Sequence, residues 1–191
     1  MNFNPIDIMR EAIATQKNKQ DKNNPWKDSL FEDIDKLKND FSGKVGETVI
    51  AEIFKLAGLD ISYTEDCTNQ NDGTYDIVTN NKRLEIKTAR MGSDKNFQHE
   101  SLRDCGSDYF VFLDIEPDKY YLTIFSSNFN FKSQHPILGR KPHLRKGSTN
   151  VYKFDFSFST IKKGLEKGVT IEINPTTRSE DIVNFIQRIV V

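Results

Sequence analysis

The sequence predicts a mixed α/β (α+β) domain in which helices flank a central mixed β-sheet. Apolar residues recur at helical spacing over about the first 58 residues, and they alternate with polar residues in short segments from residue 60 to about 125. Helical spacing returns after residue 159. The earliest strands read as antiparallel hairpins, and neither GxxxxGK[ST] nor GxGxxG occurs. These patterns exclude a doubly wound nucleotide-binding fold.

The first 41 residues predict a helical N-terminal region with possible dimer contacts. One helix is expected after Asn4 and Pro5, and its apolar residues are Ile6, Met9 and Ile13. A second amphipathic helix is expected over 26–41, with a stripe formed by Trp26, Leu30, Ile34, Leu37 and Phe41. The first three of that stripe are the candidates for a dimer contact.

A third helix is expected from a cap at Ser42 to a stop at Gly58. Glu47 shares the side of this helix that carries Ile50, Ala51 and Phe54, whereas Glu52 is rotated roughly 140° away and faces water. One acid therefore lies at the head of the apolar stripe.

Period-two alternation predicts strands over 60–65, 74–79, 82–88, 108–116 and 119–125. Asn80 and Asn81 tolerate positive φ, which favours a tight hairpin between the second and third strands. A short helix is expected to open at Gln98 and His99, and an alternating run over 151–158 places its aromatic residues on one face. A helix over 159–167, a strand over 168–173 and a helix from Ser179 are expected to complete the chain.

Composition indicates a soluble, cytoplasmic protein. The 191 residues carry a formal charge of −1, which argues neither for nor against a nucleic-acid partner. Cys67 and Cys105 lack CxxC spacing and are expected to be reduced thiols, and His135 and His143 show no zinc-ligand pattern. No signal peptide or apolar stretch of about 20 residues occurs, so no membrane contact is expected.

The strand "KRLEIKT" carries the main candidate site. Alternation places Arg83, Glu85 and Lys87 on one face, and the preceding strand delivers Asp76 beside them. Two carboxylates on adjacent strands form a hard-oxygen pocket suited to Mg²⁺, and a neighbouring lysine can hold water and offset charge on phosphorus. The alternative is a solvated ion pair that contributes roughly 0 to 1 kcal/mol. For Glu47 the alternative is an acid favoured by the helix dipole.

This pattern resembles the PD-(D/E)xK motif of restriction-endonuclease-like nucleases, although Tyr75 stands where the family commonly has Pro. The resemblance implies a catalytic core over 42–125. It implies Mg²⁺ bound by Asp76, Glu85 and the Ile86 carbonyl, with Lys87 positioning water. Glu47 would be an auxiliary acid that reaches the metal directly or through water. Some members also place a contacting Gln near Gln98, for which the alternative is an exposed polar side chain.

The C-terminal region, 126–191, contains a basic segment. Residues 119–154 hold seven Lys or Arg and no acid, which leaves −8 for the rest of the chain. We expect the loop 128–154 to contact DNA phosphates, and the candidate residues are Arg140, Lys141, Arg145 and Lys146. The alternative is a mobile solvated loop.

The leading interpretation is a Mg²⁺-dependent, sequence-specific endonuclease for double-stranded DNA, similar to a small type II restriction enzyme. A palindromic site would require a homodimer. One alternative is a structure-specific nuclease of the Holliday-junction resolvase or repair type. Another is a DNA-binding module without catalysis.

Overall fold

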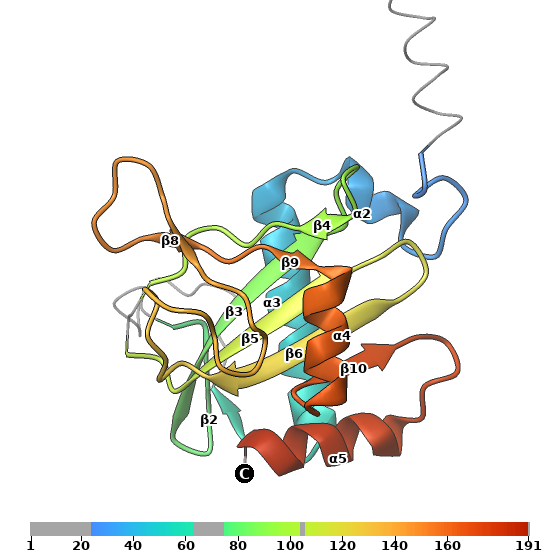
Figure 1. The fold of residues 1–191 in the computed structure, drawn as a ribbon. Helices are drawn as coiled ribbons and strands as arrows, with labels where there is room; N and C mark the ends of the chain where they lie inside the picture. Colours follow the sequence, from blue (N-terminus) through green and yellow to red (C-terminus); the bar gives the residue numbers. More distant parts are fainter. Residues whose placement is uncertain (1–23, 63–74, 104–105, 191) are drawn as a thin grey trace, which may run out of the picture.

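A six-stranded mixed sheet forms the centre of the protein (Figure 1). The computed structural model describes residues 24–62, 75–103 and 106–190. The strand order is β1-β2-β3-β5-β6-β10, in which β3 and β5 are parallel and the other pairs are antiparallel. The strands are β1 (Ile61–Ser62), β2 (Ile77–Thr79), β3 (Lys82–Arg90), β5 (Tyr109–Ile115), β6 (Tyr120–Ser126) and β10 (Thr170–Ile173). The predicted fold class is confirmed.

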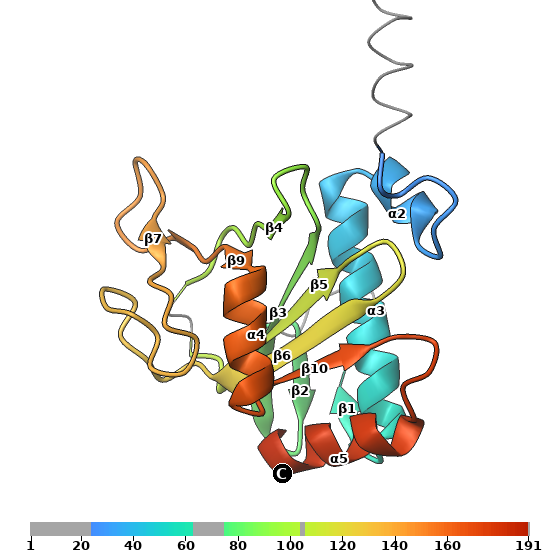
Figure 2. The same cartoon turned by 45° about the vertical axis from the view of Figure 1, so that its right-hand side comes forward.

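Two different cores cover the two faces of the sheet. The helices α3 (Asn39–Leu56) and α5 (Ser179–Val190) pack on one face with a mainly aliphatic core, and α4 (Phe158–Glu166) lies on the other (Figures 1 and 2). Alternation along β5 separates these cores, because Val111 and Leu113 point to the first and Phe110 and Phe112 to the second. The second core is rich in phenylalanine and is closed by the C-terminal half of the chain.

Short ladders hold this C-terminal half in place. β4 (Asn96–Phe97) pairs with β9 (Phe156–Ser157), and β7 (His143–Leu144) pairs with β8 (Tyr152–Lys153). The predicted alternation over 151–158 is confirmed up to Phe156, whereas Phe158 begins α4 and is exposed. The predicted tight turn at Asn80 and Asn81 is also confirmed, with φ of 46° and 60°.

The predicted second helix is wrong over much of its length. Residues 25–31 form turns, and only α2 (Glu32–Lys36) is helical before the chain becomes extended at Leu37 and Lys38. Arg90 explains this interruption, because its guanidinium donates to the carbonyls of Ile34, Asp35 and Leu37 and thereby replaces intrahelical hydrogen bonds. Trp26 and Ile34 are buried inside this chain, so they cannot form the expected dimer contact.

Two smaller predictions also fail. The third helix begins at Asn39 rather than after Ser42, because Ser42 lies buried inside the first turn. The helix predicted from Gln98 is absent from the described residues of that segment. Asn96 and Phe97 pair with β9, Leu102 bridges to Tyr152, and Ser101 has a φ of 62°. These long-range strand contacts outweigh a local helical preference.

Some predictions fall on residues outside the described ranges. They are the helix after Asn4, the end of the strand predicted over 60–65, and the environments of Cys67 and Cys105. Within the described ranges, no helix has both the length and the apolar character needed to cross a membrane.

Candidate active site

The predicted site lies where β3 extends past its neighbour β2. β2 pairs with β3 only at residues 82–84. Beyond that point Asp76 takes the place of a paired strand residue, since its N–H donates to the Leu84 carbonyl at 2.9 Å and its carboxylate accepts the Ile86 N–H at 2.7 Å. Asp76 is therefore fixed beside the stretch that carries Glu85 and Lys87.

Glu85 and Lys87 form a close ion pair. The distance from Lys87 Nζ to Glu85 Oε1 is 2.5 Å. The Lys87 side chain is 20% exposed and the Glu85 side chain is 11% exposed. The pKa of Glu85 is raised to about 7, chiefly by burial; the charge of Lys87 opposes this rise and the charge of Asp76 contributes to it. A pair so far withdrawn from water does not match the alternative of a solvated surface contact.

Asp76 and Glu47 form the acidic half of the site. Burial raises the pKa of Asp76, while the Ile86 N–H and Lys87 lower it and the Glu47 charge raises it. Glu47 thus lies close enough for its charge to act on Asp76. It comes from α3, which packs on one face of the sheet, whereas Asp76 lies at the edge of β3. As predicted, Glu47 is mostly withdrawn from water and Glu52 is exposed. Lys44 pairs with Glu47 at 2.7 Å.

Gly46 allows this approach and was missed by the sequence reasoning. A Cβ at Gly46 would lie 1.7 Å from Thr88 Oγ1, so α3 touches β3 directly at this point. The next residue of α3 is Glu47, and the residue before Thr88 is Lys87. The contact of glycine with Thr88 therefore sets how near the helix acid comes to the strand residues.

The donor set suits a hard cation. Asp76 and Glu85 supply carboxylate oxygens, and their mutual repulsion would be relieved by a bound cation. The Ile86 carbonyl faces the same edge as its N–H, because both groups of one strand residue point to the same side. Among the described residues no group of three or more acidic, His or Cys side chains could by itself hold a metal ion. A site here would therefore rest on two carboxylates and the main chain, with Glu47 acting through water.

The segment 98–103 passes along the site without forming a helix. Arg103, at its end, lowers the pKa of Glu85 through its charge, so it lies within electrostatic range of the acids. Leu102 exchanges two backbone hydrogen bonds with Tyr152, and Glu100 pairs with Lys153 at 3.0 Å. Arg103 was not predicted, because its placement depends on this pairing with a strand 50 residues away in the sequence.

The same contacts tie the basic loop to the site. Its β7–β8 hairpin projects from the body of the fold (Figure 1). Lys141, Arg145 and Lys146 are exposed, as expected for phosphate contacts. Arg140 is half-buried, and its Nε atom has no hydrogen-bond partner in the described structure. The loop therefore contains the short β7–β8 ladder and one half-buried arginine.

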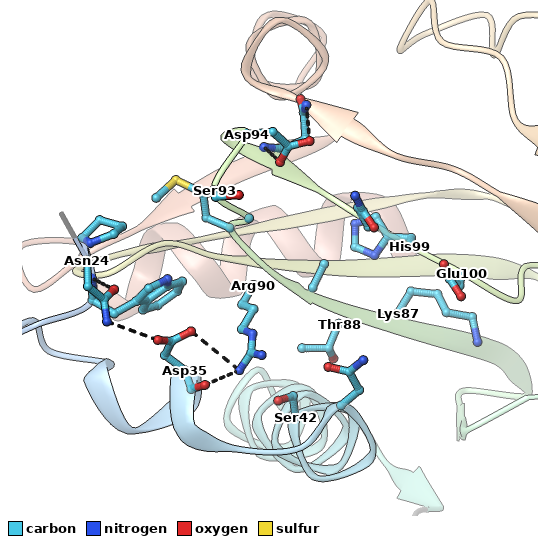
Figure 3. A pocket seen from close by; sticks show the side chains of 18 residues that line it. Asn24, Asp35, Ser42, Lys87, Thr88, Arg90, Ser93, Asp94, His99 and Glu100 are labelled. Atoms are coloured by element: carbon cyan, nitrogen blue, oxygen red, sulfur yellow. Dashed lines mark hydrogen bonds and ion pairs between the residues drawn. The ribbon is translucent and has the colours of Figure 1, made fainter. Parts of the chain in front are cut away.

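A groove of about 1400 Å³ begins at Lys87. Its walls come from residues 24–42, from the end of β3 and from residues 91–100. Figure 3 shows Lys87 and Glu100 near one end and Asn24 and Asp35 at the other. Gln98 lines the groove and is exposed, whereas His99 is buried and pairs with Asp114 at 2.7 Å.

Comparisons with known proteins give one partial match. No protein-family model and no curated protein matches the chain. Among solved structures, a bacterial homing endonuclease, I-Ssp6803I, matches with a TM-score of 0.36 and 13% identity. The match covers 47% of this chain and 70% of that one. A similarity of this extent assigns no residue and no activity to this chain.

Proposed function

We propose that the protein is a Mg²⁺-dependent endonuclease that cuts double-stranded DNA at a specific sequence, in the manner of a type II restriction enzyme of the cytoplasm. The observation that carries the proposal is the assembly of Asp76, Glu85 and Lys87 at the open edge of β3. The order of these residues resembles the PD-(D/E)xK motif. The buried Glu85 carboxylate and the half-buried Asp76 carboxylate suit a hard divalent cation next to a phosphate.

Each residue has a separate role in the proposed hydrolysis. Asp76, Glu85 and the Ile86 carbonyl would hold Mg²⁺, which when bound polarises water and the phosphate oxygens. Lys87 donates hydrogen bonds to the attacking water and offsets the charge that develops on the phosphate. A bond forms from the water oxygen to phosphorus, and one phosphodiester P–O bond breaks with its electron pair remaining on the leaving oxygen. The attacking water releases one proton to solvent, and the leaving oxygen takes one up. The Ile86 N–H keeps Asp76 oriented throughout.

A homodimer is part of the proposal, since two copies related by a two-fold axis can read a palindrome. Support comes from exposed apolar side chains near the N-terminal end of α3. Phe41 and Val45 lie one turn apart on that helix, and Leu30 is 62% exposed in the preceding segment. These residues replace Trp26 and Ile34 as candidates for the contact.

The first experiment is a cleavage assay on long unmethylated duplex DNA of mixed sequence. With Mg²⁺ the wild-type protein should produce discrete bands, and EDTA should prevent them. Lys87→Ala and Asp76→Asn should each reduce the cleavage rate by 100-fold or more, because each removes a group that acts on the reacting phosphate or on its metal. Both variants should still bind DNA within a few-fold of wild type.

Lys82→Ala is the matched control, since it removes an exposed lysine from the same strand. It should cleave at the wild-type rate. Wild-type rates in Lys87→Ala would contradict the mechanism. A metal-dependent smear would contradict sequence specificity and favour a repair-type enzyme, and DNA binding that is unchanged in EDTA without any cleavage would favour a binding module.

A further inference from the structure

The groove beside Lys87 is lined by groups that suit bases better than phosphates. Its charged residues comprise three acids, Asp35, Asp94 and Glu100, and two cations, Lys87 and Arg90. The acids outnumber the cations, so the lining does not attract a polyanion. A phosphate backbone is therefore not the occupant that its electrostatics favour.

The two cations are also engaged within the protein. The guanidinium of Arg90 donates hydrogen bonds to three carbonyls in and beside α2. Its Nη1 atom also lies 3.9 Å from Asp35 Oδ1. Lys87 pairs with Glu85 at the end of the groove. Only Lys87 thus lies where a phosphate would be cut, and the groove extends away from that point.

Two amide side chains in this groove remain available to a ligand. Gln98 and Asn39 are both exposed, and neither side chain forms a hydrogen bond within the described residues. The other amides are held in place, Asn24 by Asp35 and Asn96 by Asp94. One available amide lies at the start of α3, which packs on one face of the sheet, and the other follows β4, which pairs with β9 over the other face.

We infer that this groove reads the bases next to the scissile phosphate, with Gln98 and Asn39 as the residues that determine specificity. An amide side chain donates and accepts at once, which matches the N6 and N7 edge of adenine. The basic loop would then supply phosphate contacts, and the groove would supply sequence choice. This inference rests on the proposed nuclease activity, because it assigns the substrate contacts of the same site.

The test is a cleavage-site profile on a library of random duplex sequences, obtained by sequencing the ends. Gln98→Ala should still cut but should lose about tenfold or more of the base discrimination at a position beside the cut. Asn39→Ala should reduce the base discrimination at a neighbouring position of the cleavage site. Gln98→Glu should shift the preference from adenine towards cytosine, because a carboxylate accepts from the cytosine amino group.

Asn184→Ala is the control, since it removes an exposed amide from α5 and should leave the profile unchanged. Wild-type profiles in the Gln98 and Asn39 variants would overturn the inference and leave the nuclease standing. Equal DNA binding with all cleavage lost in Gln98→Ala would also overturn it, since Gln98 would then belong to the reaction itself. Absence of cleavage by the wild-type protein with Mg²⁺ would instead refute the proposed function.

Discussion

At the scale of single residues, Gly46 allows α3 to pack directly against β3 beside the site. Its missing side chain lets α3 touch Thr88, and this contact brings Glu47 towards Asp76. The hydroxyl of Thr88 has no hydrogen-bond partner among the described residues, so close packing is what holds this contact together. A methyl group at this point has no space.

Gly46→Ala should destabilise the protein by about 1 to 3 kcal/mol, because the added Cβ overlaps Thr88 and forces α3 outward. It should also slow cleavage by moving Glu47. Gly43→Ala is the matched control on the same helix, since a Cβ there meets nothing within 4 Å. Gly43→Ala should increase the free energy of unfolding by up to about 1 kcal/mol. Urea unfolding of both variants tests this, and equal effects would contradict it.

Some residues of the site could be predicted from local sequence patterns, whereas others are placed by contacts between distant parts of the chain. Asp76, Glu85 and Lys87 could be predicted because strand alternation and a two-residue turn fix them relative to one another. Glu47 could be predicted from helical spacing. Gly46 and Arg103 could not, since the first depends on helix-to-strand distance and the second on pairing between residues 102 and 152.

At the scale of elements, a buried histidine organises the turn that leads into the basic loop. His135 Nδ1 accepts the N–H groups of Ile137 and Leu138, and its ring packs on Phe125 at 4.4 Å between centroids. Burial lowers the pKa of His135 to about 4, because a charged ring is disfavoured there. The turn therefore needs the neutral imidazole.

Stability should consequently fall as the solution is acidified. The folded pKa of His135 is about 4 against an ordinary value of 6.5, so the unfolded chain binds more protons between these values. Between pH 7 and pH 5 this residue should remove about 2 kcal/mol of unfolding free energy. His135→Asn should lose that part of the pH dependence. His143→Asn, an exposed neighbour, should retain it, and identical pH profiles for wild type and His135→Asn would contradict the assignment.

Elements set by local periodicity could be predicted from the sequence, whereas segments set by long-range contacts could not. The helices and strands with long, regular periods were predicted closely, including β3, β5, β6 and α5. The helix over 26–41 failed because Arg90 captures carbonyls that a continuous helix would use. The helix at Gln98 failed because β9 and Tyr152 pair with that segment.

At the scale of the whole molecule, the charge is nearly balanced and strongly separated. Residues 119–154 carry +7 and the remainder −8. Under the proposed function, residues 119–154 would supply the main attraction to DNA, and the β7–β8 hairpin holds two of their exposed cations, Arg145 and Lys146. The contacts of Leu102 and Glu100 with this region keep it beside the site.

The double variant Arg145→Ala/Lys146→Ala should weaken DNA binding and flatten its salt dependence by up to about 2 in the slope of log K against log salt. Binding is best measured in the Lys87→Ala background, which should leave the DNA intact. Lys162→Ala/Lys167→Ala removes the same charge from α4 and its C-terminal cap and should leave the slope unchanged. A similar loss in both pairs would indicate only a net-charge effect.

Trp26 gives the molecule an internal optical reporter. It is the chain's sole tryptophan, it is 3% exposed, and it lines the groove that begins at Lys87. Its fluorescence therefore comes from one known place, next to the inferred base contacts. A nucleotide segment that enters the groove would change the water and polar groups around the indole, so occupancy can be followed by emission without a label and before any bond is cut.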